Sequence, residues 1–221
     1  MLYHRQAVRD NIRNREGKRV FYLGKGDQLT ADARDYLTSE RIEILPAEQA
    51  RPVRYQLLGG GYMEEKPEHM THLNAQILVP KTHPRIAFRG AMDALEAELL
   101  LCQLYAPCWE KELEQVLAFA RRLLRCEVLE EPVEEMQLCG LDAAELRRRS
   151  HQPQEFYGQT HFMPAASDGA AILYLNRVRC AARAAELQAV AAFPDREDLL
   201  RAMNRMSSML YILMIQEKAK H

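Results

Sequence analysis

The chain has 221 residues, of which 48% are hydrophobic and 28% charged, and its formal net charge is −1. This composition is typical of a globular protein, and the near-zero charge argues against broad electrostatic binding to nucleic acid, which needs a basic excess. No apolar run reaches the roughly 20 residues that cross a bilayer, and the N-terminus lacks the apolar segment of a signal peptide. The sequence therefore predicts a cytoplasmic protein with neither a nucleic-acid nor a membrane partner.

The first sixty residues are predicted to form a small α/β segment. A strand, a helix and a second strand are expected at residues 20–24, 30–39 and 42–45. Thr30 is the expected N-cap of the helix. The triple glycine at residues 59–61 is typical of a flexible joint. We therefore expect an N-terminal segment at residues 1–60 and a second domain at residues 61–221.

Residues 66–86 precede the helical part, and their prolines exclude a regular helix. Thr71, His72 and Lys81, together with backbone amides, are suitable ligands for a polyphosphate. An ordinary capped loop explains the same pattern, so both interpretations stay open. The histidines lack accompanying cysteines or closely spaced carboxylates, so metal ligation by protein side chains is not predicted.

From about residue 84 onward the pattern is helical almost throughout. Apolar side chains recur at three- and four-residue spacing over four long stretches. These stretches cover residues 85–105, 109–128, 170–192 and 194–218. A shorter helix is expected to begin at Asp142, which can cap it. Helices joined by short connections predict an antiparallel bundle, so the fold class is mainly α with a small N-terminal α/β segment.

The helix at residues 170–192 carries a charged stripe among apolar residues. Arg179, Arg183 and Glu186 have spacings of four and three, which place them on one helix face. Two guanidinium groups in dry surroundings need anionic partners. A phosphate-bearing ligand, an internal salt-bridge network and a merely exposed stripe all remain open interpretations of this helix by itself.

The last helix has a similar polar stripe at Asn204, Ser208 and Tyr211. The Asn204 side chain both donates and accepts hydrogen bonds, which suits contact with a nucleoside. The outer face of an amphipathic helix shows the same pattern, so the stripe alone does not decide between the two.

The cysteines do not indicate a disulfide framework or a zinc site. They are Cys102, Cys108, Cys126, Cys139 and Cys180. Their number is odd and none forms a Cys-x-x-Cys pair. We interpret them as small buried hydrophobic side chains in a reducing compartment.

Several stretches in the second domain resemble the cobalamin adenosyltransferases of the propanediol-utilisation type. In chain order they are VPKTHPRI at 79–86, RGAMDAL at 89–95, FMPAAS at 162–167, RCAARAAE at 179–186 and NRMSS at 204–208. The resemblance is closer still to the ethanolamine-utilisation branch, whose signatures are similar to THL at 71–73 and SHQP at 150–153. It covers roughly residues 66–216.

The resemblance implies an enzyme that transfers the 5′-deoxyadenosyl group of ATP to Co(I) of a corrinoid and releases triphosphate. It implies a homotrimer of five-helix bundles, with ATP and Mg²⁺ bound between neighbouring subunits and cobalamin as the second substrate. A cobalamin-dependent ammonia-lyase or a bacterial microcompartment is the implied partner, which would place the enzyme in or near that compartment. The corrinoid supplies the nucleophile, so no Ser-His-Asp apparatus is required.

The resemblance also implies roles for individual residues. Arg183, Glu186 and Asn204 match the catalytic residues, which also bind ATP. Arg179 matches an arginine that forms an ion pair across the subunit boundary with an acid matching Asp93. Arg183 is also the residue that is expected to neutralise the triphosphate as it leaves.

Two further sets of residues are implied in the same way. The expected triphosphate ligands are Thr71, His72 and Lys81. The expected corrinoid-facing residues are His161, Phe162 and Met163. The family's glycine- and aspartate-bearing phosphate loop is absent here and is replaced by residues 71–73. The histidine-plus-cysteine cluster of some ethanolamine-branch enzymes has no counterpart around residues 50–75, so a transition metal bound by protein is not expected.

Two other classes of function remain open. A non-catalytic protein that carries adenosylcobalamin, or that regulates through it, would keep the binding residues without turnover. A purely structural helical bundle would show no rise in melting temperature with ATP.

Overall fold

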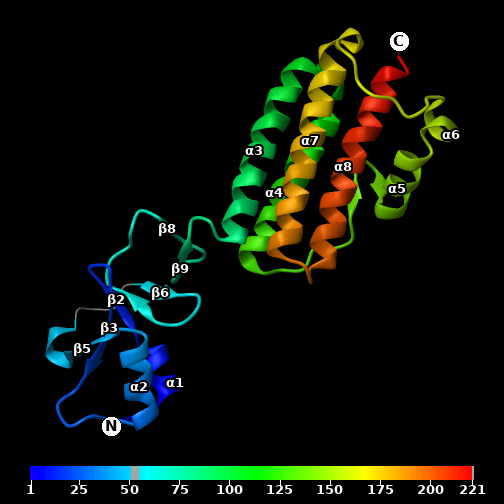
Figure 1. Cartoon of the computed structure of the whole chain (residues 1–221). Coiled ribbons are helices and arrows are strands. Elements are labelled where there is room, and N and C mark those ends of the chain that lie inside the picture. The colour runs from blue at the N-terminus through cyan, green and yellow to red at the C-terminus, as the bar shows by residue number, and fades with distance from the viewer. Residues whose placement is uncertain (51–54, 221) are drawn as a thin grey trace. The chain divides into compact units, whose positions relative to one another are not determined.

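The computed structural model describes residues 1–50 and 55–220 (Figure 1). It consists of two units, Met1–His83 and Pro84–His221. The first contains short strands and small helices, and the second is almost entirely helical. The mainly helical fold with a small N-terminal sheet region, predicted from the sequence, is confirmed.

Seven strands of the described residues form one mixed sheet in the N-terminal unit, in the order β5-β3-β2-β7-β6-β9-β8. Their bounds are β2 Arg13–Arg15, β3 Lys18–Leu23, β5 Glu43–Pro46, β6 Tyr55–Leu57, β7 Tyr62–Met63, β8 Met70–His72 and β9 Ile77–Pro80. A separate parallel pair joins β1, Leu2–Tyr3, to β4, Gln28–Leu29. The expected strands at 20–24 and 42–45 correspond to β3 and β5, which pair in parallel.

Two helices, α1 (Arg5–Asp10) and α2 (Ala31–Ser39), complete the core of this unit. Thr30 Oγ1 accepts a hydrogen bond from the Ala33 backbone N–H at 3.3 Å, which confirms the predicted cap of α2. A short 3₁₀ helix, η1, covers Ala47–Gln49. The buried apolar cluster beneath the helices is Val8, Ile12, Phe21, Leu29, Ala33, Leu37 and Ile42.

The triple glycine is a hairpin turn between β6 and β7, so the expected flexible joint was wrong. Gly60 and Gly61 have φ of +91° and +86°, a left-handed conformation that favours glycine. A Cβ atom on Gly61 would lie 2.7 Å from the Ile12 carbonyl oxygen, because the hairpin packs closely on the end of β2. The division between the units instead follows His83. The domain boundary expected after residue 60 stays a prediction.

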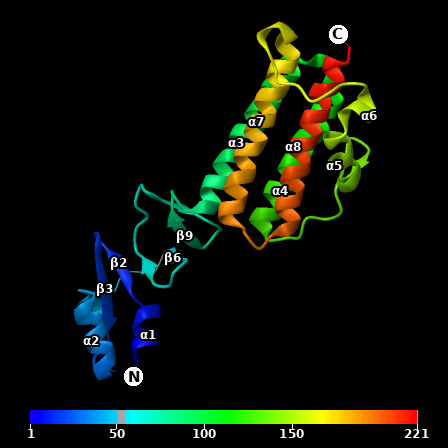
Figure 2. The ribbon, with the colours of Figure 1, turned by 45° about the vertical axis from the view of Figure 1, so that its right-hand side comes forward.

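Within residues 84–220, four long helices form most of the second unit (Figures 1 and 2). They are α3 Pro84–Tyr105, α4 Glu110–Leu129, α7 Gly169–Ala192 and α8 Glu197–Lys218. The last begins three residues later than expected, because Pro194 and Asp195 form a turn. In both views α7 lies between α3 and α8 and runs antiparallel to each.

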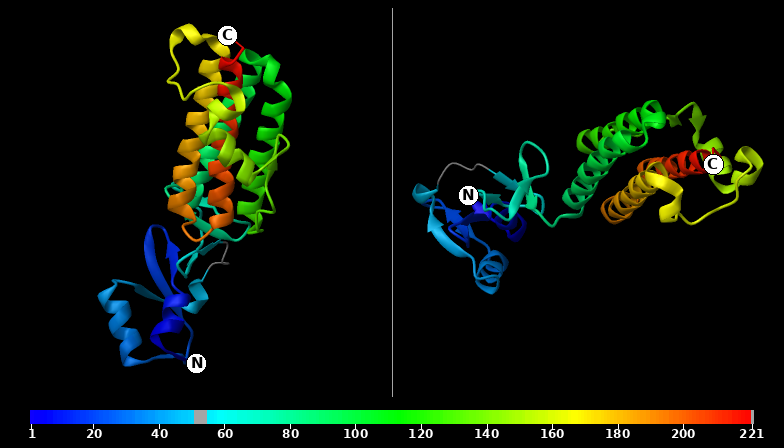
Figure 3. Two further views of the ribbon diagram at one scale, coloured as in Figure 1. Left: turned by 90° about the vertical axis from the view of Figure 1, so that its right-hand side faces the viewer. Right: turned by 90° about the horizontal axis from the view of Figure 1, so that it is seen from above.

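A short 3₁₀ helix, η2 Pro107–Trp109, connects α3 to α4, and further short elements fill the long connection between α4 and α7. The latter are β10 Gln137–Leu138, β11 Leu141–Asp142, α5 Ala143–His151, α6 Pro153–Tyr157 and η3 Ala166–Asp168. Asp142 accepts from the Glu145 backbone N–H at 2.8 Å, which confirms the predicted cap of α5. Figure 3 (left) shows α5 and the loop that follows it alongside α8.

The core of the helical unit follows from apolar periodicity. On α3, Phe88, Met92, Leu95 and Leu99 are fully buried at spacings of four and three. Each such side chain contributes roughly 1.5–3 kcal/mol on burial. None of the helices in the described part of the chain is long and apolar enough to span a membrane.

A buried ionic clamp joins the start of α3 to the end of α4. Arg85 Nε lies 2.7 Å from Glu127 Oε1, and Arg89 Nε lies 2.7 Å from Glu127 Oε2. The Glu127 side chain is 0% exposed. Both carboxylate oxygens are therefore paired, as a buried charge requires.

The cysteines follow the prediction only in part. Cys102 and Cys126 are buried, whereas Cys108 and Cys180 are exposed, so the interpretation of all five as buried was wrong. Burial raises the pKa of Cys102 to about 12, with the charge of Glu98 adding to the shift. That thiol is therefore an inert apolar side chain.

Candidate functional site

A shallow hollow of about 410 Å³ lies where the outer surface of α7 meets α8. Its walls are formed by Arg179, Cys180, Arg183, Ala184, Glu186, Leu187, Val190 and Asn204. The shared face predicted for Arg179, Arg183 and Glu186 is confirmed, and Asn204 reaches it from the next helix. Three of the residues expected at the nucleotide site, Arg183, Glu186 and Asn204, therefore lie around one hollow, together with Arg179, which was expected in an ion pair between subunits.

Glu186 and Asn204 are joined directly across the two helices. Asn204 Nδ2 donates to Glu186 Oε1 at 2.8 Å, and Arg205 Nη1 donates to Asn204 Oδ1 at 2.9 Å. Burial lowers the pKa of Arg205, and the nearby charge of Arg147 lowers it further. Both the nitrogen and the oxygen of the Asn204 amide are thus hydrogen-bonded, whereas the second carboxylate oxygen of Glu186 is available to a ligand.

Arg183 differs from its neighbours in the hollow. Its side chain is exposed, and within residues 1–50 and 55–220 it has no hydrogen-bond or ion-pair partner. The expectation of dry surroundings for both arginines is therefore wrong for Arg183 in a single chain. An exposed guanidinium beside a hollow is available to an anion that enters it.

Arg179 is half-buried and held in place. Its Nη2 and Nε atoms donate to Asn176 Oδ1 at 3.0 and 3.3 Å. Its guanidinium also lies 5.7 Å from the centre of the Tyr211 ring, a cation–π contact. Arg179 is therefore held by Asn176, one helical turn earlier on α7, and by Tyr211 on α8.

Tyr211 connects the hollow to the loop before α7. His161 Nδ1 and the Tyr211 hydroxyl are 2.9 Å apart, and the two rings stack with an angle of 6° between their planes. Because Arg179 contacts the same tyrosine ring, His161, Tyr211 and Arg179 form a continuous row.

The three residues expected to face the corrinoid point in different directions. His161 is exposed and lies on Tyr211, whereas Phe162 is half-buried against the bundle core. Met163 is 89% exposed. Met163 alone therefore projects from the loop as an uncovered apolar side chain.

Asp168 fastens this loop to the bundle. It accepts hydrogen bonds from the Ala165 backbone N–H at 2.7 Å and from Lys218 Nζ near the end of α8. Lys218 and the backbone hydrogen bond hold the pKa of Asp168 below its usual range. The carboxylate is therefore ionised at neutral pH and pairs with Lys218.

Asp93 lies exposed on α3. Among the described residues, an ion pair between Arg177 Nε and Glu98 Oε2, at 2.7 Å, joins α3 to α7, and it does not involve Asp93. The pairing of Asp93 with Arg179 was expected between subunits, which one chain does not test. It stays a prediction.

The other expected triphosphate ligands lie in the N-terminal unit, on one hairpin. Thr71 and His72 belong to β8, and the Lys81 backbone N–H donates to the His69 carbonyl beside it at 2.8 Å. Successive strand residues point to opposite faces, so Thr71 and His72 lie on different faces of the hairpin. The His72 ring packs edge-on against Tyr55.

The supporting residues Asn176 and Arg205 were missed by sequence reasoning, and Tyr211 was noted only as part of a polar stripe. Asn176 precedes Arg179 by three residues, a spacing that places both on one helix face. That spacing is a weak signal, because polar pairs are common on helices. In the described residues, no group of three or more His, Cys, Asp or Glu side chains is placed to hold a metal ion.

Comparison with known proteins gives consistent matches. The family described as cobalamin adenosyltransferase matches residues 61–217. The corrinoid adenosyltransferase EutT of Salmonella typhimurium is 30% identical over 244 residues, covering 97% of this chain and 91% of that protein. The corrinoid adenosyltransferase EutT of Escherichia coli is 33% identical over 163 residues, covering 71% of this chain and 61% of that protein. No solved structure matches significantly.

The matched region contains both the hollow on α7 and α8 and the loop with His161. The family predicted from the sequence is confirmed, and the relatives named EutT agree with the predicted ethanolamine-utilisation branch. This chain therefore belongs to the cobalamin adenosyltransferase family and is a transferase enzyme.

Proposed function

We propose that this protein is an ATP:cob(I)alamin adenosyltransferase whose nucleotide lies in the hollow formed by α7 and α8. The observation that carries the proposal is Arg183, an exposed guanidinium without a partner in the described chain, beside Glu186 and Asn204. Family membership supports the reaction class, and the hollow supplies the groups that a nucleoside triphosphate needs.

In the proposed reaction, the electron pair of Co(I) forms a bond to the 5′ carbon of ATP. The bond from that carbon to the triphosphate oxygen breaks, and its electron pair leaves with the triphosphate, so cobalt ends as Co(III). Negative charge therefore grows on the triphosphate in the transition state. Arg183 is positioned to stabilise it as a preorganised cation.

Glu186 and Asn204 are proposed to hold the nucleoside. Asn204 orients the Glu186 carboxylate through the 2.8 Å hydrogen bond and leaves its second oxygen for a ribose or base donor. Asn204 Oδ1 keeps one lone pair besides the one that Arg205 uses. Fixing the nucleoside in this way aligns its 5′ carbon with the nucleophile.

Mg²⁺ would accompany the triphosphate. Glu186 is the one carboxylate in the lining of the hollow, and one of its oxygens is already engaged. Because the other oxygen of Glu186 is proposed to hold the nucleoside, Mg²⁺ would be bound mainly through triphosphate oxygens and waters, which suits an ion that usually keeps several of its waters. Thr71, His72 and Lys81 are proposed, on family resemblance, as further triphosphate ligands.

A homotrimer of five-helix bundles, with ATP between subunits and an Asp93–Arg179 pair across the boundary, completes the proposal; α5 would be the fifth helix. Its support is an uncovered apolar stripe along α3 and α7. The exposed members are Ala94, Ala97, Leu100, Leu104, Leu173, Cys180, Ala184 and Leu187. Leu104 is 75% and Leu187 69% exposed. Exposed apolar stripes of this kind mark protein interfaces.

The stripe runs into the nucleotide hollow. Cys180, Ala184 and Leu187 belong to both. A second subunit seated on the stripe would therefore close the hollow, exclude water and strengthen the interaction of Arg183 with phosphate.

The corrinoid is proposed to contact the loop that contains His161, Phe162 and Met163. The exposed Met163 side chain supplies an apolar surface, and His161 is held by Tyr211. Such a surface excludes water from the lower face of cobalt, which favours Co(I). A cytoplasmic location, with an ammonia-lyase or microcompartment as partner, follows from the same family resemblance.

The decisive experiment compares turnover of cob(I)alamin and MgATP by the wild type and by Arg183→Ala, with the visible spectrum of the corrinoid as the readout. We expect a loss of about 100-fold or more, which is typical when a group that stabilises transition-state charge is removed. Arg201→Ala removes an exposed arginine of α8 outside this hollow and should keep full activity.

Two results would reject the proposal. Full turnover by a folded Arg183→Ala protein would show that the residue on which the proposal depends is not needed for the reaction. Binding of ATP and cobalamin by the wild type without any turnover would favour the rival function, a non-catalytic carrier or regulator.

A further inference from the structure

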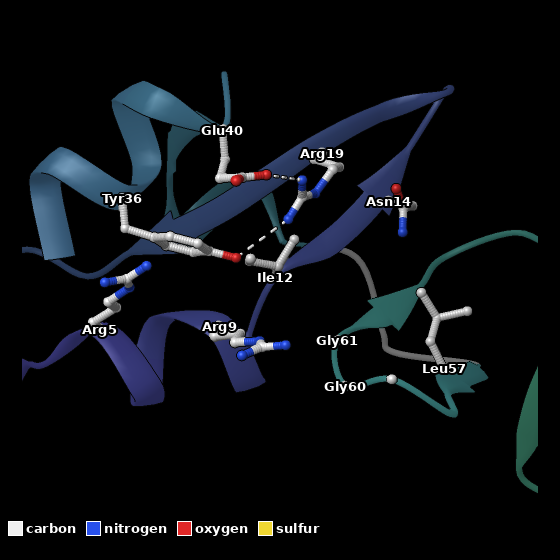
Figure 4. A pocket seen from close by; sticks show the side chains of 11 residues that line it. Arg5, Arg9, Ile12, Asn14, Arg19, Tyr36, Glu40, Leu57, Gly60 and Gly61 are labelled. Carbon is white, nitrogen blue, oxygen red and sulfur yellow. Dashed lines mark hydrogen bonds and ion pairs between the residues drawn. The ribbon is translucent and has the colours of Figure 1, made fainter.

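A second hollow, of about 450 Å³, lies within the N-terminal unit, and neither the proposed reaction nor the family match uses it (Figure 4). It is lined by Arg5, Arg9, Ile12, Asn14, Arg19, Tyr36, Glu40, Leu57, Gly59, Gly60 and Gly61. The family match begins at residue 61, so most of this lining lies outside the matched region.

Three arginines converge on the hollow from two elements. Arg5 and Arg9 come from successive turns of α1, and Arg19 comes from β3 on the opposite side (Figure 4). Glu40 is the one acidic side chain among the lining residues. Like charges gathered in this way repel one another unless an anion lies between them.

The arginines differ in how far they are neutralised. Arg19 Nη1 lies 2.9 Å from Glu40 Oε2, and Arg5 Nη1 lies 3.5 Å from Asp32 Oδ1. Arg9 has no hydrogen-bond or ion-pair partner within residues 1–50 and 55–220. The Asn14 side chain is likewise unengaged among those residues. The hollow thus contains an uncompensated guanidinium and an available amide.

The rest of the lining suits an organic group attached to the anion. Tyr36 presents its ring, against which Arg5 stacks at 5.1 Å, and its hydroxyl accepts from Arg19 Nη2 at 3.4 Å. Leu57 adds an apolar side chain, and the glycine turn leaves the space beside it open, since a Cβ atom on Gly59 would meet nothing within 4 Å. The volume exceeds that of a lone phosphate ion.

We infer that this hollow is a binding site for a small phosphate-bearing molecule. Guanidinium groups match phosphate oxygens in bidentate geometry, and three of them suit a dianion better than a single carboxylate. The inference goes beyond the proposed adenosyl transfer and does not depend on it.

The test is isothermal titration calorimetry of the full chain with pyrophosphate, at constant ionic strength balanced with chloride. We expect saturable binding that Arg9→Gln weakens about tenfold or more, the effect of losing one charge-assisted hydrogen bond. Arg34→Gln is the matched control, because it removes the same charge from an exposed arginine of α2 outside the hollow. Both variants should keep the wild-type melting temperature.

A second comparison separates this site from the nucleotide hollow. Pyrophosphate binding should persist in Arg183→Ala and be weakened when Arg9→Gln is added to it. The inference is overturned by the absence of saturable binding, by equal weakening in Arg34→Gln, or by binding that depends on Arg183 alone. AMP, ribose 5-phosphate and inorganic phosphate are titrated in the same way. The ester that binds more tightly than inorganic phosphate identifies the organic group for which the site is suited.

Discussion

Asn204 on α8 donates a hydrogen bond to Glu186 on α7, with 2.8 Å between Nδ2 and Oε1, across the wall of the proposed nucleotide hollow. The pair joins two helices at the point where the ligand is expected. Its members lie 18 residues apart in the chain and meet only because α7 and α8 pack antiparallel. Ligand binding should therefore depend on the two residues together.

Asn204→Ala should raise the KM for ATP, because Glu186 loses the donor that orients it. A hydrogen bond to a charged group contributes about 1.5–3 kcal/mol, so we expect an increase of about tenfold or more. Combined with Glu186→Gln, the effects should be non-additive, with a coupling energy of about 0.5–3 kcal/mol. Ser208→Ala, which removes a bond from that hydroxyl to the Asn204 carbonyl, is the control and should be near wild type. Strict additivity would contradict the pairing.

Tyr211 is expected to position both His161 and Arg179. Tyr211→Phe keeps the ring beneath Arg179 but removes the hydroxyl that meets His161, at a cost of about 0.5–1.5 kcal/mol. Its effect should appear in the KM for the corrinoid, whereas Tyr211→Leu should also raise the KM for ATP. Steady-state kinetics with each substrate varied in turn separate the two. Identical profiles for both variants would show that the hydroxyl has no role of its own.

Glu127 should be the most costly carboxylate to remove from the helical unit. Glu127→Gln leaves Arg85 and Arg89 without their buried counter-charge, and breaking a buried pair costs about 3–5 kcal/mol. Glu130→Gln, whose side chain is 70% exposed and also bonds Arg85, should cost less than about 1 kcal/mol. Urea unfolding measures both. Similar losses in the two variants would mean that the clamp does not depend on burial.

The stability of the helical unit should fall in acid partly through Asp198. This carboxylate accepts from Arg196 Nε at 2.9 Å and from the Val133 backbone N–H at 2.8 Å. The hydrogen bond from Arg196 holds the pKa of Asp198 well below its usual range in the folded state. The unfolded chain therefore takes up the proton first, and the stabilisation is present above about pH 4 and lost as the pH falls further.

Asp198→Asn tests this directly. At pH 7 the variant should unfold at a lower temperature than the wild type, by a difference that corresponds to about 1 kcal/mol. The gap should narrow progressively when melting is measured between pH 4 and pH 2. A gap that stays constant over that range would rule out the titration of Asp198 as its cause.

The apolar stripe on α3 and α7 should control assembly. Leu187→Glu places a charge in the stripe and should shift the protein toward the monomer in sedimentation equilibrium, with a loss of turnover because the hollow is no longer closed. Leu58→Glu alters a leucine of the N-terminal unit that is 52% exposed, and it should leave the mass unchanged. A wild type that is monomeric at all concentrations would end the proposal of a shared nucleotide site.

Local patterns predicted the elements that depend on near neighbours in the chain. The apolar periodicity of residues 85–105 and 170–192 gave α3 and α7 almost to the residue, because one face of each must be buried. Thr30 and Asp142 were recognised as caps because a cap is a hydrogen bond between a side-chain oxygen and the backbone N–H three residues later. Such a bond does not depend on any other part of the fold.

The short strands β6 to β9 escaped prediction for the opposite reason. Each has two to four residues, and β8 and β9 lie in a stretch with prolines. Besides the two hairpins, their pairing depends on more distant strands, as when β6 aligns in parallel with β9 and β7 with β2. The glycines at 59–61 were misjudged because a linker and a tight turn share the same composition, and only the approach to Ile12 distinguishes them.

By itself the sequence determined the helical face with Arg179, Arg183 and Glu186, because spacing along a helix fixes which side chains share a face. The family was predicted from the resemblance of several motifs, in their order along the chain. Only the tertiary structure decided that Asn204 meets Glu186, that Tyr211 lies between His161 and Arg179, and that Arg183 stays exposed. Those relationships depend on how one helix is rotated and shifted against another. Packing of the whole core sets that register, and no short stretch of residues contains it.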